Sequence, residues 1–343
     1  MKIGDLSVDM ASVIVKVVEL HGIDGEALLK EYKLSLDQLS VPNSRISIPH
    51  YMRLGHAAIE KTKIPWLGLE LGQHAHITHF GLVGACAMAS PTLGEAVSKL
   101  NQYQDLISRN IRGRYTAHME EEYWYHRLYS LAPYNSYNYF VVDSVLSGWR
   151  NNAEWFTGKT DLLKEVHIEY REPKYSQVFE EHFQCPVLFE QEFNQLVLHK
   201  ETINLPSQYH AASAYHSLDS MCDQALKNHQ RGSTLVNQVE DTLSQLLHQQ
   251  TPTIEKVAKK LAMSPWTLRR KLQSLDLTFQ TLLNRTRQSL AETYIRHTNH
   301  SFGEIAFLLG FSSPAAFQRA FKRWTGQNPG EYRKLAIQME KEI

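Results

Sequence analysis

The sequence has few of the features that mark secreted, membrane or metal-binding proteins. Its 343 residues include three cysteines, Cys86, Cys185 and Cys222, which are far apart and odd in number. This pattern argues against a disulfide framework or a CxxC metal knuckle, so we expect buried free thiols. No run of about 18 uncharged apolar residues occurs, which argues against a membrane span. Asp5 and Asp9 stand where a signal peptide needs an apolar run, so we expect a cytoplasmic protein.

The sequence also lacks the short motifs of common enzymes, since it contains no GxSxG, P-loop or GxGxxG pattern. The acidic run 120–122 is an alternative source of acid–base chemistry, but a charge run at a strand boundary is usually solvated. His74, His76 and His79 have spacings found in metal-ligand clusters, but no Cys, Asp or Glu accompanies them, so polar or core histidines are the expectation. We therefore predict no catalytic residue, no metal site and no cofactor.

Net charge is absent from the whole chain but not from its parts. Lys and Arg number 36, as do Asp and Glu. Residues 251–343 contain 15 basic and 7 acidic residues, a charge of +8, which leaves 21 basic and 29 acidic residues in 1–250, a charge of −8. A basic C-terminal segment on an acidic body suggests that one end of the protein meets a polyanion.

The region before residue 207 shows mixed helical and strand patterns. Apolar periodicity predicts helices, and alternation with β-branched and aromatic residues predicts strands. The expected helices are 10–20, 24–31, 47–62, one opening at Thr92 with a Thr92–Glu95 capping box, 135–157 and 174–183; the expected strands are 112–119, 123–130, 163–171 and 193–199. The apolar stretch 80–90 is either core or the lining of a ligand pocket, with core as the default. The effector pocket itself stays unassigned.

Leu205-Pro206-Ser207 has the composition of a domain exit, and only helices are expected beyond it. We predict three parts: an α+β effector-binding and dimerisation domain over 1–207, a linker helix over 208–233, and an all-α DNA-binding domain over 234–343.

An internal repeat is the strongest signal in the chain. TIEKVAKKLAMSPWTLRRKL (253–272) aligns with SFGEIAFLLGFSSPAAFQRAF (301–321) at an offset of 48, which becomes 49 after one extra residue. Each copy has the pattern of a helix, a tight turn and a second helix, so we predict two helix-turn-helix motifs at 253–274 and 301–324. Gly310 permits a left-handed turn, and Ser264-Pro265 and Ser313-Pro314 each place a cap before a proline.

The second helix of each copy has a buried face and a polar face. Leu268 and Leu272 are expected to point inward in the first copy, and Phe317 and Phe321 in the second. Arg and Gln on such a helix can contact base edges in a DNA major groove. We predict DNA contacts from Trp266, Arg269, Arg270, Gln273, Ala315, Gln318, Arg319 and Lys322. Two alternatives stay open: Trp266 as a packing residue, and Arg287 as either an internal ion-pair member or a phosphate contact.

One long helix, 278–298, is expected to join the two copies, with Leu282, Leu290 and Tyr294 in its buried stripe. Twenty-one helical residues span about 31 Å. Successive major grooves on one face of DNA lie about 34 Å apart, so this helix can hold two recognition helices in adjacent grooves.

The stretch from Ser264 to Ile295 and the stretch SFGEIAFLLGFSSPAAFQRAFKRWTGQNPGEYR closely resemble the AraC/XylS transcription regulators, over roughly 235–335. The resemblance implies the DNA contacts named above. The N-terminal stretch FGLVGACAMASPTLGEAVSKLNQY is similar to the arabinose-binding-type effector domain of a subfamily that includes ornithine-utilisation and virulence regulators. That similarity implies a domain that senses a small molecule or dimerises.

We therefore expect a homodimeric transcription regulator with promoter DNA, RNA polymerase and a small-molecule effector as its partners, and we expect activation rather than repression. Effector binding must favour one arrangement of the DNA-binding parts, or it changes nothing. The rival hypotheses are a DNA-tethered enzyme or metal sensor built on residues 1–205, and a non-specific architectural DNA binder.

Overall fold

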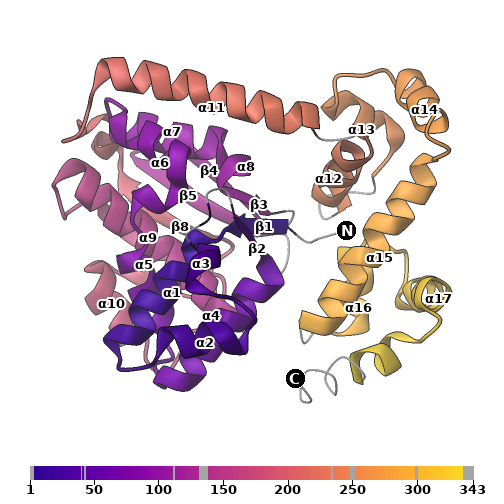
Figure 1. Cartoon of the computed structure of the whole chain (residues 1–343), viewed down its shortest axis with the longest axis horizontal. Helices are drawn as coiled ribbons and strands as arrows, with labels where there is room; N and C mark the ends of the chain where they lie inside the picture. Colours follow the sequence, from indigo (N-terminus) through magenta and orange to yellow (C-terminus); the bar gives the residue numbers. More distant parts are fainter. Residues whose placement is uncertain are drawn as a thin grey trace. The chain divides into compact units, whose positions relative to one another are not determined.

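The structure is a computed structural model that describes residues 4–39, 41, 44–110, 113–130, 138–232, 235–247, 252–297 and 300–334. Parts of our predicted elements, namely residues 112, 135–137, 233, 298 and 335–343, lie outside the described residues. The chain divides into two compact units, Gly4–Asn228 and His229–Ile343. Figure 1 shows the helices and strands of both units.

The first unit is an α+β domain, as the sequence predicted. Its helices enclose apolar side chains that repeat at helical spacing, such as Ile14 and Val18, both completely buried. The helices are α1 (Asp9–Leu20), α2 (Gly25–Glu31), α3 (Leu36–Leu39), α4 (Ile48–Thr62), α5 (Leu67–His74), η1 (Ile77–Phe80), α6 (Gly81–Ala89), α7 (Leu93–Gln102), α8 (Gln104–Ile107), α9 (Tyr139–Thr157), α10 (Gln177–Phe183), η2 (Lys200–Asn204) and α11 (Ala212–Gly232).

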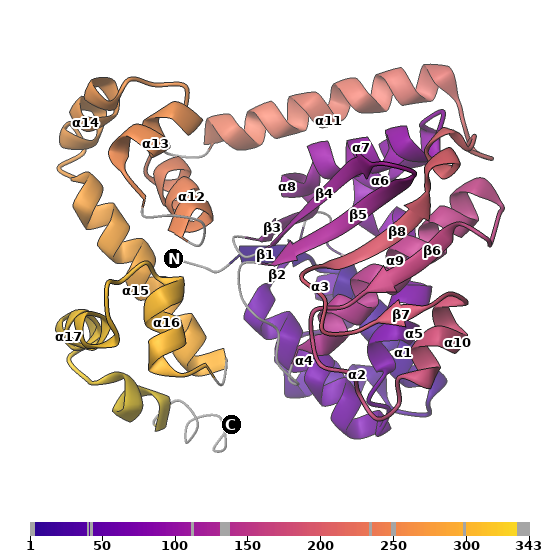
Figure 2. The same ribbon diagram turned by 180° about the vertical axis from the view of Figure 1, so that it is seen from behind.

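Two sheets complete this unit. The larger has the strand order β4-β5-β8-β6-β7, and the smaller has the order β2-β1-β3. The strands are β1 (Gly4–Ser7), β2 (Arg45–Ser47), β3 (Ser108–Asn110), β4 (Gly113–Glu120), β5 (Tyr123–Ser130), β6 (Leu163–His167), β7 (Val187–Leu188) and β8 (Asn194–His199). In Figure 2 the larger sheet faces the reader and α9 lies behind it. Our strand prediction missed β1, β2, β3 and β7, because two to four residues are too few to show a period of two.

Helices α5 and α9 approach each other closely because glycine lies at their crossing. A Cβ atom on Gly72 would lie 2.4 Å from Cβ of Ser147, so only glycine fits. A Cβ atom on Gly68 would lie 2.7 Å from Cβ of Asp143. The Gly-rich stretch from residue 66, to which we assigned no elements, is thus helical, with its glycines at a packing contact.

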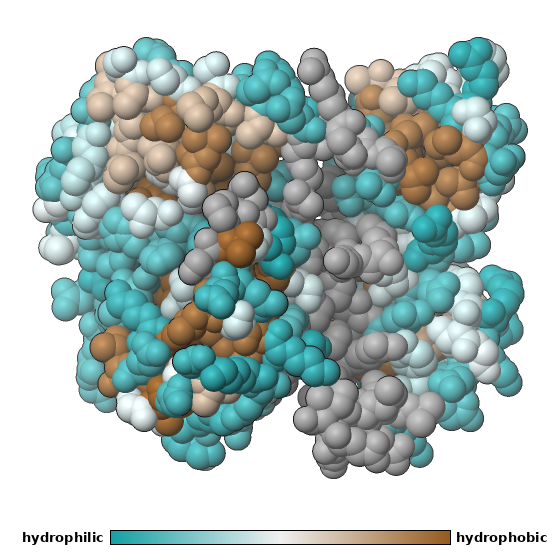
Figure 3. All heavy atoms as spheres, in the orientation of Figure 1, coloured by the Kyte–Doolittle hydropathy of each residue, from teal (hydrophilic) through white to brown (hydrophobic). Residues whose placement is uncertain are grey.

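Helix α11 packs on α6 and α7 through a small apolar cluster that includes Cys86 and Cys222, both fully buried free thiols. Cys185 is partly buried. In Figure 3 apolar colour gathers over the region of α6 and α7, in keeping with the almost wholly apolar sequence of α6. The first compact unit therefore continues past residue 207 to Asn228.

Polar contacts add to this packing. Lys99 Nζ lies 2.8 Å from Asp219 Oδ1, and the Tyr103 hydroxyl donates to the same carboxylate at 2.7 Å. Tyr215 donates from its hydroxyl to Glu95 Oε1 at 2.5 Å. Half of our predicted capping box is therefore wrong: Thr92 accepts from the Glu95 backbone N–H, but the Glu95 carboxylate is turned towards α11.

In its described residues the second unit has helices and no strands, as predicted. The helices are α12 (Leu235–Leu247), α13 (Ile254–Lys260), α14 (Pro265–Gln273), α15 (Phe279–His297), α16 (Phe302–Leu308) and α17 (Pro314–Thr325). The expected stripe of α15 is buried throughout, with Leu282, Leu290 and Tyr294 at 2% exposure or less. This unit has its own core, built around α15.

Asp143 makes the stability of the first unit depend on pH. Burial raises the pKa of its carboxyl from 3.8 to about 7, and the hydrogen bond from the Tyr170 hydroxyl opposes the rise. Because the folded-state pKa is the higher one, the folded protein holds the proton between about pH 4 and pH 7. The free energy of unfolding therefore falls as the pH rises through that window.

We predict that Asp143→Asn removes much of this fall. At pH 8 the variant is expected to be more stable than the unmodified protein by on the order of 2–4 kcal/mol, and at pH 4 nearly equal to it. Urea unfolding monitored at both pH values measures the difference. Parallel pH profiles for the two proteins would show that Asp143 is not the group responsible.

Candidate nucleic-acid interface and ligand cavity

The two helix-turn-helix motifs reverse the chain through the same turn. In the first, the Met263 backbone N–H donates to the Ala258 carbonyl at 2.9 Å; in the second, Phe311 donates to Ala306, also at 2.9 Å. This bond closes a helix with a left-handed residue, which is Gly310 in the second motif, with φ +64°. Ala262 holds the equivalent position in the first motif with φ +52°, although it has a side chain.

Each second helix begins at a serine cap followed by proline, as predicted. Ser264 accepts from the Thr267 N–H at 3.0 Å, and Ser313 accepts from the Ala316 N–H at 3.2 Å. The capping box between Ser301 and Glu304 at the start of α16 is also present. These caps fix where the recognition helices α14 and α17 begin.

The inner faces of both recognition helices are occupied by the apolar residues that the repeat placed there. These residues are at most 1% exposed, and they are Leu268, Leu272, Phe317 and Phe321. All eight predicted DNA-contacting residues are exposed instead: Trp266, Arg269, Arg270 and Gln273 on α14, and Ala315, Gln318, Arg319 and Lys322 on α17. The structure thus gathers the eight into two surface faces, and their contact with DNA stays a prediction.

Trp266 is 65% exposed, so it is not a core packing residue. The Arg270 guanidinium lies 4.7 Å above its ring, one helical turn away on the same face. Among the residues that the structure describes, Arg269, Arg270, Arg319 and Lys322 form no ion pair with a carboxylate. Their charges remain available to an external anion.

Helix α15 separates the two recognition helices within the second unit. Its 19 residues extend for about 28 Å at 1.5 Å per residue. In Figures 1 and 2, α14 and α17 lie at opposite ends of α15 and on the same side of it. This arrangement suits two successive major grooves on one face of a duplex.

Arg287 on α15 anchors the second motif. Its Nε and Nη2 each donate at 2.9 Å, to the carbonyl oxygens of Leu309 and Gly310, and its guanidinium lies 4.7 Å above the Phe311 ring. Burial lowers the pKa of Arg287. Among the described residues the guanidinium therefore binds backbone carbonyls at the end of α16 rather than a carboxylate, and the phosphate contact stays a prediction.

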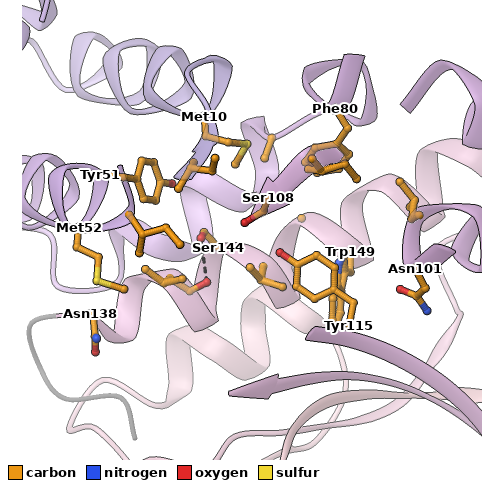
Figure 4. Close-up of a pocket in the computed structure, with 18 of the residues that line it drawn as sticks. Met10, Tyr51, Met52, Phe80, Asn101, Ser108, Tyr115, Asn138, Ser144 and Trp149 are labelled. Carbon is orange, nitrogen blue, oxygen red and sulfur yellow. Dashed lines mark hydrogen bonds between the residues drawn. The ribbon is translucent and has the colours of Figure 1, made fainter. Parts of the chain in front are cut away.

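The first unit encloses a cavity of about 130 Å³ between α4, α7, α9 and the two sheets. Figure 4 shows Met10, Tyr51 and Phe80 on its walls, with Tyr115 beside Trp149. Its full lining is Leu6, Met10, Ile48, Tyr51, Met52, Ala75, Phe80, Leu100, Asn101, Ile107, Ser108, Tyr115, His126, Asn138, Val141, Ser144, Val145, Gly148 and Trp149. The stretch 80–90 thus contributes Phe80 to the cavity, while Val83 and Ala87 belong to the core.

His126 is the most unusual residue in the lining. It is 4% exposed and stacks on Trp149 with 3.6 Å between ring centroids. Its Nε2 has no hydrogen-bond partner among the described residues. Burial lowers the pKa of His126 to about 3, so its imidazole is neutral at pH 7. Our sequence prediction missed this cavity because its walls come from segments that are distant in the chain.

The other candidate sites have ordinary roles. His76 packs edge-on against Trp155, and His79 contacts the His76 backbone. No group of three or more metal-ligating side chains occurs in the part of the chain that the structure describes. The acidic run 120–122 is exposed at the turn between β4 and β5. None of the described helices is long and apolar enough to cross a membrane.

Two helix-turn-helix motifs joined by a rigid helix, with exposed cations on both recognition helices, define a DNA-binding protein. Comparison with protein families agrees. The family described as "Arabinose-binding domain of AraC transcription regulator, N-term" matches residues 22–207, and a helix-turn-helix domain family matches residues 257–335. The chain belongs to the AraC family of transcription regulators, with an arabinose-binding-type N-terminal domain.

Its relatives are named as regulators. The ornithine utilization regulator of Pseudomonas aeruginosa is 26% identical over 324 residues, which cover 94% of this chain and 95% of the relative. The regulator VqsM of the same organism is 23% identical over 279 residues, covering 78% and 83%. The crystal structure of the regulator CdpR, also from Pseudomonas aeruginosa, is 20% identical and covers 90% of this chain and 97% of that one, with a TM-score of 0.44. The chain is a regulator rather than an enzyme, and double-stranded DNA is its partner.

We predict that Arg287→Met destabilises the second unit by about 2–3 kcal/mol, because two partly buried carbonyls lose a charged donor. Urea unfolding of the full chain measures this change. Gln280→Met, an exposed change on the same helix, serves as the control and is expected to stay within about 0.5 kcal/mol. Equal stabilities for the two variants would contradict the anchoring role.

Proposed function

We propose that this protein is a sequence-specific regulator whose second unit reads two successive major grooves of promoter DNA. The observation that carries the proposal is the pair of recognition helices on one side of α15, each with exposed cationic and amide side chains. Arg pairs with guanine and Gln with adenine through two hydrogen bonds each. Arg270, stacked on Trp266, is proposed as a base contact, and the residues of α17 as base or phosphate contacts.

The matched pair Arg270→Ala and Lys271→Ala tests this proposal. Both residues are exposed cations on α14, but Lys271 lies off the face formed by the four predicted contacts. Arg270→Ala is expected to cost about 1–3 kcal/mol of binding free energy and to relax the preference at particular base pairs. Lys271→Ala is expected to change affinity less and to leave the sequence preference intact.

Affinities for the protein's own upstream region and for random DNA are measured at one stated salt concentration. A ratio near one for the unmodified protein would contradict specific regulation and favour an architectural DNA binder. A uniform loss over all sequences for Arg270→Ala would make Arg270 a phosphate contact.

We further propose that residues 1–207 with the linker helix 208–233 form an effector-controlled domain, and that residues 234–343 form the DNA-binding domain. Helix α7 supports this proposal because it contacts both the cavity and α11. Leu100 and Asn101 line the cavity, while Lys99 and Tyr103 hold Asp219 of α11. A ligand that shifts α7 would alter the polar contacts between α7 and α11, the helix that leads to the DNA-binding part of the chain. Control requires that the ligand bind one of these arrangements better than the other.

We propose a cytoplasmic homodimer that activates transcription by contacting RNA polymerase. Closed two-fold dimers are the commonest soluble oligomers, and a dimer would place four recognition helices on an operator. Sedimentation at the concentration that half-saturates the promoter is expected to give a dimer mass. A strict monomer there would remove the dimer from the proposal.

The name of the Pseudomonas aeruginosa relative refers to ornithine utilization. L-Ornithine is therefore a compound to be tested as an effector of this protein.

A further inference from the structure

The cavity in the first unit has a chemistry that restricts its ligand. Its walls contain no Asp, Glu, Lys or Arg among the described residues. The one imidazole ring among these lining residues, that of His126, is stacked and deeply buried. Moving an ion from water into such surroundings without a partner costs more free energy than the apolar contacts of so small a ligand can regain. A ligand with a full positive or negative charge therefore has no counter-charge in this cavity.

Two unpartnered polar atoms show where a neutral ligand has something to bind. His126 Nε2 and Asn101 Oδ1 are both buried and have no hydrogen-bond partner among the described residues. Buried polar atoms are nearly always hydrogen-bonded, and both residues belong to the cavity lining, so a ligand that reaches either atom can supply the missing partner. Ser144, by contrast, already donates to the Val141 carbonyl at 3.0 Å (Figure 4).

The volume of the cavity also limits the size of its ligand. An apolar protein cavity of about 150 Å³ is known to hold benzene. The volume of about 130 Å³ in this unit is close to that. Tyr51, Phe80, Tyr115 and Trp149 supply aromatic walls. A smaller space of about 40 Å³ adjoins it, sharing Phe80, Leu100, His126 and Trp149 as lining.

We propose that this cavity binds an uncharged, mostly apolar molecule, about the size of a ring with one small substituent, that forms a hydrogen bond with His126 Nε2. The inference deepens the proposed effector control of this unit and rests on it. It also disfavours a free amino acid such as L-ornithine, whose two ammonium groups and carboxylate would all enter without a counter-charge.

Four aromatic probes test, on the full chain, whether the cavity prefers uncharged ligands. They are benzyl alcohol, benzylammonium, benzoate and toluene. Calorimetric titration is expected to show benzyl alcohol binding at least about tenfold more tightly than either ion, a difference of about 1.4 kcal/mol. L-Ornithine is expected not to bind. An ion or L-ornithine binding as tightly as the alcohol would overturn the proposal, as would the failure of all probes at millimolar concentration.

Two variants test the hydrogen bond. His126→Phe keeps the stack on Trp149 but removes Nε2, so benzyl alcohol is expected to bind about fivefold to tenfold more weakly while toluene is unaffected. His118→Phe is the matched control, because His118 is also a strand histidine stacked on an aromatic ring, Tyr125, but lies outside the cavity. Equal losses for both variants, or a loss of toluene binding in a folded His126→Phe protein, would refute the role of Nε2.

DNA affinity measured with and without benzyl alcohol separates this inference from the proposed function. Probe binding with the expected selectivity but unchanged DNA affinity supports the ligand class and refutes effector control through this cavity. If DNA affinity responds to benzylammonium or benzoate, and the protein does not bind benzyl alcohol more tightly than these ions, effector control is supported and the proposed ligand class is overturned.

Discussion

The second unit depends on one partly buried guanidinium. Arg287 reaches from the middle of α15 to the carbonyls of Leu309 and Gly310, where α16 ends and the chain turns towards α17. Because α15 is a single helix, fixing that turn to it fixes the second recognition helix relative to the first. A double helix-turn-helix can match the spacing of DNA grooves only if this connection is rigid, so Arg287 helps to set the geometry of the residues that we predict to contact DNA.

In the first unit, helix α7 takes part in two different contacts. Leu100 and Asn101 of this helix line the cavity. Lys99 of the same helix and Tyr103 directly after it bind Asp219 of α11. The buried thiols of Cys86 and Cys222 lie in the same contact. A change at the cavity would therefore have a short path of packed side chains to follow, and contiguous contacts of this kind can carry coupling between sites.

Prediction from the sequence succeeded where the signal is local and periodic. The repeat located both turns, the caps at Ser264 and Ser313, the buried Phe317 and Phe321, and the exposed faces, because helical spacing alone decides which side of a helix is apolar. It missed the left-handed Ala262, since alanine gives no indication of a positive φ. It did not predict that Arg287 binds backbone carbonyls, since carbonyls exposed at the end of another helix cannot be seen in a sequence.

The sequence by itself determined the class of the protein, the α+β and all-α division, and the exposure of the eight residues that we predict to contact DNA. Only the tertiary structure decided that His126 stacks on Trp149 with an unsatisfied nitrogen, and that residues from Leu6 to Trp149 enclose one cavity. The physical reason is distance along the chain. A helix face follows from neighbours three and four residues apart, whereas a cavity and its polarity follow from segments that meet only after the core has packed.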